Sequence, residues 1–94
     1  MGRGLNVEEQ RDRYEWYEAL IEREDRLLRQ IQTGEICLFA VLETMYRKDR
    51  EIDLETAKVI VQRIYGYTDE HRSELWQVRI EKTVLAVQLK QEGR

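Results

Sequence analysis

Apolar residues in the first third of the chain recur at alternating steps of three and four, the spacing of one face of an α-helix. The stripe runs through residues 14, 17, 21, 28 and 31. Glu24 is its one polar exception. Asn6 can cap the free amides at the start, and Gly34 is a residue type that commonly ends helices. The pattern predicts a helix over residues 6–32.

The next segment, residues 35–48, is apolar on almost every side in its first half. Such a pattern indicates burial on all faces. A short buried strand over residues 36–42 is the alternative, but the leucine, alanine and methionine content favours a helix. We therefore expect a second, buried helix over residues 35–48.

Two further helices are expected after a polar connection. Asp53 can cap a helix over residues 53–66, with Gly66 at its end. Thr68 can cap a helix over residues 69–92, whose first turn holds acidic residues that suit the helix dipole.

The last of these helices carries two apolar stripes. One stripe contains Leu75, Val78, Leu85 and Leu89, with Lys82 filling its gap, and the other contains Trp76, Ile80, Val84 and Val87. Together they form an apolar face wider than one neighbouring helix covers. Apolar residues at positions 76, 78 and 80 alternate with polar ones, which is typical of a strand. A strand over residues 75–87 is therefore the alternative to a helix there.

The expected fold is all-α, with four helices in one domain over residues 1–94 and a flexible segment at residues 1–5. A compact globule of this length is about 32 Å across. Helices over residues 6–32 and 69–92 are about 40 and 36 Å long, whereas the middle two are about 21 Å each. The long helices would overhang the short ones, so we expect a homo-oligomer, most simply a dimer, that covers their apolar ends.

Composition narrows the class of protein. Proline is absent, glycine numbers only 5, and 37% of the residues are charged, with a formal net charge of −3. No apolar run is long enough for a membrane span. A single cysteine, Cys37, fits a reducing compartment, and we expect a cytoplasmic protein.

Residues that could carry chemistry are few. His71 is the only histidine and is expected in an exposed first turn beside acidic residues, which limits acid–base catalysis and metal binding. Cys37 is expected to fill the core. Since no phosphate loop or nucleophile motif is present, we expect no catalytic residues, no metal, no cofactor and no enzymatic activity.

Candidate binding residues are mainly aromatic and apolar. Tyr14 and Tyr17 belong to the first stripe, whereas Trp16 falls beside it and either packs on Leu5 or the last helix or anchors a partner. Further candidates for partner binding are Leu28, Trp76 and Leu85. The favoured function is a self-associating protein-interaction module that serves as an adapter, inhibitor or assembly factor.

A basic turn offers an alternative function. Arg47, Lys48 and Arg50 form the densest cationic cluster, and Lys58, Arg63 and Arg72 could extend it in space. This cluster would suit a nucleic-acid-associated regulator. The acidic balance of the chain opposes that reading, because nucleic-acid binders usually carry a basic surface.

Overall fold

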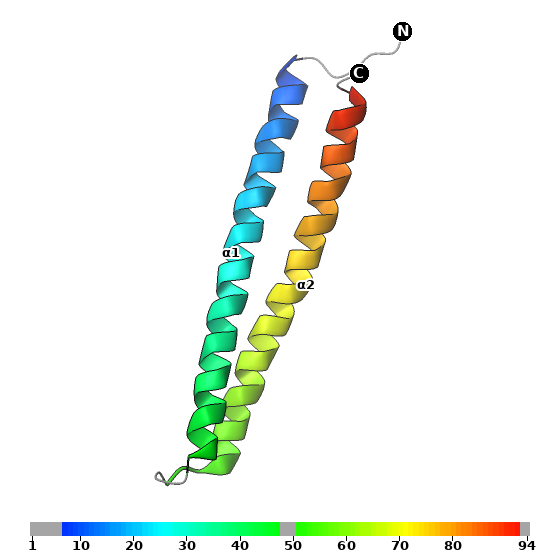
Figure 1. The fold of residues 1–94 in the computed structure, drawn as a ribbon. Helices are drawn as coiled ribbons and strands as arrows, with labels where there is room; N and C mark the ends of the chain where they lie inside the picture. The colour runs from blue at the N-terminus through cyan, green and yellow to red at the C-terminus, as the bar shows by residue number, and fades with distance from the viewer. Residues whose placement is uncertain (1–6, 48–50, 93–94) are drawn as a thin grey trace.

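The protein is a hairpin of two long antiparallel helices (Figure 1). The computed structural model describes residues 7–47 and 51–92. Helix α1 spans Val7–Tyr46 and helix α2 spans Leu54–Glu92. The molecule extends 74 × 16 × 15 Å, and its radius of gyration is 20.9 Å. The predicted all-α class is confirmed, and the predicted four-helix arrangement is wrong.

The error in the number of helices comes from the two interior glycines. Neither Gly34 nor Gly66 has the positive φ angle of a glycine that ends a helix. Both lie inside continuous helices. An interior glycine costs only about 1 kcal/mol relative to alanine, which packing along a long helix outweighs. Thr68, predicted to cap a helix, is instead an interior residue of α2.

The remaining predictions about helix ends and strands have different outcomes. The predicted helix start after Asp53 is confirmed, because the Ala57 amide donates to the Asp53 carbonyl oxygen at 3.0 Å. The Thr56 hydroxyl also donates to the Asp53 carboxylate at 2.5 Å. The strand alternatives for residues 36–42 and 75–87 are excluded, since both are helical. The predicted Asn6 cap lies outside the described residues.

The contact between the helices follows a heptad repeat, the signature of a coiled coil. In each helix the buried and half-buried side chains recur at alternating steps of three and four. We call these positions the seam. In α1 they are Tyr17, Leu20, Glu24, Leu27, Ile31, Gly34, Leu38, Val41 and Met45; in α2 they are Ala57, Val61, Ile64, Thr68, His71, Leu75, Val78, Lys82, Leu85 and Leu89. The fold is therefore a two-stranded antiparallel coiled coil.

One heptad position shows why a glycine was needed. Gly34 lies on the seam opposite Thr68, whose side chain is only 1% exposed. A β-carbon at Gly34 would overlap the Thr68 Cγ2 methyl group. The missing side chain lets the two backbones approach closely at this level. Nothing lies within 4 Å of a β-carbon built at Gly66, which marks no such approach.

The predicted burial of residues 35–48 on all sides is wrong. Ile36, Phe39 and Leu42 are exposed, and Phe39 retains 67% of its accessible surface. Cys37, expected in the core, is also exposed. A helix with a single neighbour can bury only one stripe, so the remaining apolar residues of this segment face outward.

The molecule is elongated and not the compact globule from which overhanging helices were expected. Each helix pairs with the other along the rod. Leu27, Ile31, Leu85 and Leu89, which lie near the ends of the two long helices that the sequence predicted, are buried in the seam. Tyr14, placed on the buried stripe, is exposed, because the true seam passes through Tyr17 and Leu20.

The two interior glycines should respond oppositely to substitution by alanine. Gly34→Ala should lower the free energy of unfolding by about 1–2 kcal/mol, because crowding Thr68 outweighs the gain in helix propensity. Gly66→Ala, the matched control, should raise it by about 0.5–1 kcal/mol. Denaturant unfolding followed by circular dichroism measures both.

A compensating variant tests the cause. Thr68→Ser removes the crowded methyl but keeps the hydroxyl that donates to the Tyr65 carbonyl oxygen at 2.9 Å. Gly34→Ala combined with Thr68→Ser should recover most of the stability lost in Gly34→Ala. A stabilising effect of Gly34→Ala alone would show that the helices are not held in close contact there.

Candidate protein-interaction surface

An exposed apolar stripe lies on the outer face of α2. Trp76, Ile80, Val84 and Val87, at steps of four, four and three, form what we call the outer stripe. Each retains between 49% and 63% of its accessible surface. Ile80 and Val87 each follow a seam residue by two positions, about 200° around the helix. The outer stripe therefore faces away from α1.

Trp16 of α1 extends this surface across the groove between the helices. It remains 53% exposed and lines a shallow hollow with Ile80, Val84 and Leu85. The sequence left two readings of Trp16, packing on the last helix or anchoring a partner. The Trp16 side chain lies beside α2, but it stays largely open to solvent. Leu5 lies outside the described residues. Both tryptophans thus lie in the half of the hairpin where α1 begins and α2 ends.

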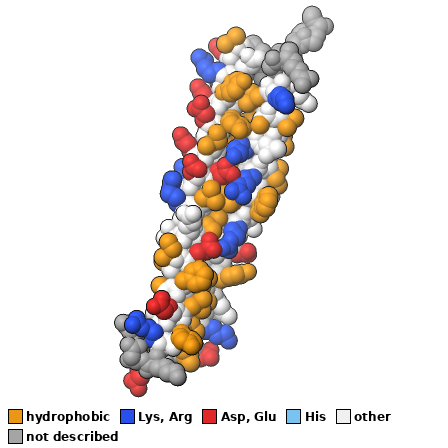
Figure 2. Space-filling view, in the orientation of Figure 1, with side chains coloured by type: hydrophobic (Ala, Val, Ile, Leu, Met, Phe, Trp, Pro, Cys, Tyr) orange, Lys and Arg blue, Asp and Glu red, His pale blue; other side chains and the backbone are white. Residues whose placement is uncertain are grey.

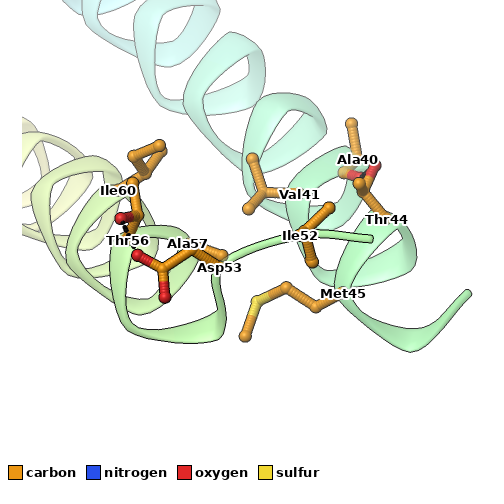
Figure 3. A pocket seen from close by; sticks show the side chains of 9 residues that line it. All are labelled: Ala40, Val41, Thr44, Met45, Ile52, Asp53, Thr56, Ala57 and Ile60. Carbon is orange, nitrogen blue, oxygen red and sulfur yellow. Dashed lines mark hydrogen bonds between the residues drawn. The ribbon is translucent and has the colours of Figure 1, made fainter. Parts of the chain in front are cut away.

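A second apolar feature lies at the turn between the helices. A hollow of about 520 Å³ opens between the end of α1 and the start of α2 (Figure 3). Its lining is mostly aliphatic, and its nine residues are Ala40, Val41, Thr44, Met45, Ile52, Asp53, Thr56, Ala57 and Ile60. The only charged side chain in the lining belongs to Asp53, which receives the hydrogen bond from Thr56.

The sequence contains a signal for this hollow that the apolar periodicity does not reveal. Ile52 immediately precedes Asp53, the N-cap residue of α2, and Ala57 is the fourth residue of the helix. An apolar pair at these two positions is a hydrophobic staple. Both residues line the hollow. On the opposite side of α1, Ile36, Phe39 and Tyr46 are also exposed. Figure 2 shows hydrophobic side chains at the surface along much of the hairpin.

Glu24 and Lys82, the charged residues that interrupt the two predicted apolar stripes, meet in the seam. The Glu24 carboxylate accepts hydrogen bonds from Lys82 Nζ at 2.5 Å and Arg79 Nε at 2.7 Å. The Glu24 side chain is only 14% exposed. The hydrogen bonds from Lys82 and Arg79 hold the pKa of the Glu24 carboxyl below its usual value. A buried charge of this kind is tolerated because it is paired on two sides.

Exposed polar contacts flank the seam along its length. Arg23 pairs with Glu74, and Arg72 Nη2 lies 3.4 Å from the Glu35 carboxylate. Near the chain ends, the Arg13 guanidinium donates to the Gln88 side chain at 3.4 Å. Exposed pairs contribute little stability individually. Together they are consistent with the antiparallel register of the seam.

His71 and Cys37 differ from their expected positions. His71 is a half-buried seam residue in the middle of α2, and not a first-turn residue, because α2 begins at Leu54. Its Nδ1 donates to the Tyr67 carbonyl oxygen at 2.7 Å, and its ring lies 4.0 Å from the Tyr67 ring. Within the described ranges, no three His, Cys, Asp or Glu residues are grouped to hold a metal.

The other predicted site residues divide between the seam and the turn. Leu85 is buried in the seam, and Leu28 is half-buried against the core, so both stabilise the hairpin itself. In the basic turn, Arg47 is described and exposed, whereas Lys48 and Arg50 lie outside the described residues. Arg72 lies about 27 Å along α2 from its first residue, too far to join that cluster.

Comparison with known proteins identifies no relative. No protein-family model matches the chain, and no curated protein or solved structure does either. Neither helix, over the residues described, combines the length and apolarity needed to cross a membrane.

The Glu24 cluster should make stability depend on pH in acid. Because the pKa of folded Glu24 is lowered, its ionised form stabilises the fold above the ordinary carboxyl pKa, and this contribution is lost as pH falls through the lowered value. Glu24→Gln should cost about 1–2 kcal/mol at neutral pH and lose less stability than the wild type between about pH 5 and pH 3.

Urea unfolding at a series of pH values measures this difference. Glu22→Gln, an exposed change on the same helix, provides the control and should follow the wild-type pH curve. Equal pH dependence in wild type and Glu24→Gln would contradict a stabilising role for the cluster.

Proposed function

We propose that the protein is a protein-interaction module: a rod-like helical hairpin that self-associates and docks on a partner protein as an adapter, inhibitor or assembly factor. The observation that carries this proposal is the outer stripe, where four large apolar side chains face away from their own fold. Contiguous exposed apolar patches often mark the sites at which proteins bind one another.

The surface area of the chain supports the same proposal. The single chain exposes 7624 Å², whereas a compact monomer of its mass would expose about 5,800 Å². The hairpin geometry causes this excess, because each helix covers only one stripe of the other. Association with another chain would cover part of the remaining apolar area, at roughly 25 cal/mol per Å².

The distribution of the apolar features suits an adapter. The hairpin has the turn at one end, and at the other end α1 begins and α2 ends (Figure 1). The hollow lies at the turn, whereas the outer stripe and Trp16 lie in the half of the hairpin toward the other end. Two apolar sites separated along a 74 Å rod allow two chains to bind without competing for one surface. Tryptophans are among the residues that contribute most to binding at protein interfaces.

Replacing the outer stripe should separate association from folding. Trp76→Gln combined with Ile80→Gln should yield a monomer across the micromolar range with unchanged helix content, because neither side chain is needed in the seam. Gln62→Ala, on the same helix but away from the stripe, is the control and should leave the mass unchanged. Light scattering and circular dichroism report the two properties.

A strictly monomeric wild-type chain at all concentrations tested would contradict self-association. Loss of helix content in the double variant would instead show that the outer stripe contributes to the hairpin.

A further inference from the structure

The ends of the outer stripe carry opposite charges on one flank. Asp69, Trp76, Thr83 and Lys90 are spaced by seven residues, so they share one side of α2 next to the stripe. All four are exposed. Asp69 lies seven residues before Trp76, and Lys90 lies three residues beyond Val87. The flank is therefore acidic at one end and basic at the other.

We propose that two copies of the chain pair through their outer stripes, with the two α2 helices antiparallel and a two-fold axis at Ile80. This inference rests on the self-association in the proposed function and names its surface, orientation and register. The product is a four-helix bundle in which the α2 helices form the centre and each α1 helix lies outside its own α2.

The two-fold axis determines which side chains meet. Ile80 meets Ile80 of the second copy, and Ser73 meets Val87 of the second copy, because each pair is placed symmetrically about the axis. These three residues lie seven apart, so they project along one line of the helix. Trp76 lies near Thr83 of the second copy, where a small side chain leaves room for the indole ring.

The charges select this orientation. In the antiparallel arrangement, Asp69 lies beside Lys90 of the second copy, and the symmetric pair forms at the other end. In a parallel two-fold dimer, each flank of α2 faces the opposite flank of the second copy, so Asp69 would lie near Glu70 of the second copy and Lys90 near Gln91. The parallel arrangement therefore has two repulsive contacts and no attractive pair, so electrostatics favours the antiparallel dimer and its register.

The apolar area is sufficient for a reversible dimer. Trp16 and the outer stripe expose roughly 500 Å² of side-chain surface per copy, on the order of 1,000 Å² for the pair. This value lies at the low end for specific interfaces, which predicts a dimer that dissociates on dilution. Helices packed at the usual 8–10 Å separation would bring the facing Ile80 positions within disulfide range.

Disulfide trapping tests the orientation and register. In a Cys37→Ser background, Ile80→Cys should form a covalent dimer on mild oxidation. Ser73→Cys is the matched control on the same helix line, and it should not, because its two copies would lie about 21 Å apart along the axis. A mixture of Ser73→Cys and Val87→Cys chains should form the cross-linked heterodimer.

Charge exchange tests the same arrangement with Ile80 intact. Asp69→Lys or Lys90→Asp alone should raise the dissociation constant about tenfold, since each places like charges together at both ends of the dimer. The double exchange should restore it to within about threefold of wild type. Sedimentation equilibrium at low salt measures these constants.

The outcomes separate this inference from the proposed function. A dimer that cross-links equally at Ser73 and Ile80, or that the double exchange does not restore, would overturn the antiparallel register while leaving self-association in place. A chain that never dimerises would overturn both. Cross-linking at Ile80 alone together with restored affinity in the double exchange is the result expected.

Discussion

The hairpin depends on a single contact, the heptad seam between α1 and α2. Among the described residues, no third element packs on either helix, so the seam supplies all of the tertiary burial. Its core residues retain at most 9% of their accessible surface although the molecule is only about 16 Å thick. Because one seam covers one stripe per helix, the same geometry that stabilises the fold leaves other apolar residues exposed. The stability of the hairpin and its exposed apolar surface are therefore two consequences of one arrangement.

Charged residues interrupt the apolar seam at one level and help to define its register. Glu24 from α1 meets Lys82 and Arg79 from α2. A shift of one helix by one heptad would place Leu75 or Leu89 opposite Glu24 in place of Lys82, so the half-buried carboxylate would lose its lysine partner in the seam. Gly34 and Thr68 add a steric constraint, since only this pairing places the missing side chain opposite the buried threonine. Both constraints oppose slippage, to which long uniform coiled coils are prone.

The two exposed apolar features lie at different places along the rod, as the proposed adapter role requires. The outer stripe and Trp16 form an apolar area with rigid aromatic anchors on a straight helix, which needs no rearrangement before binding. The hollow at the turn is lined by flexible and branched side chains such as Met45 and Ile60, which can adapt to an apolar side chain from another protein. A rod with two such sites is a reasonable scaffold for joining two other chains.

The sequence by itself determined the helical class, the start of α2 at Asp53 and the two stripes of its second half. These features depend on local spacing and capping. The buried residues from Leu75 to Leu89 could therefore be recognised without knowing which helix packs against them. Tertiary structure decided the rest. Whether Gly34 and Gly66 end a helix depends on the packing energy around them, and the pairing of Glu24 with Lys82 joins residues far apart in the chain. The exposure of Phe39 and Trp76 depends on how many other helices pack against each helix. The spacing of apolar residues in the sequence does not determine that number.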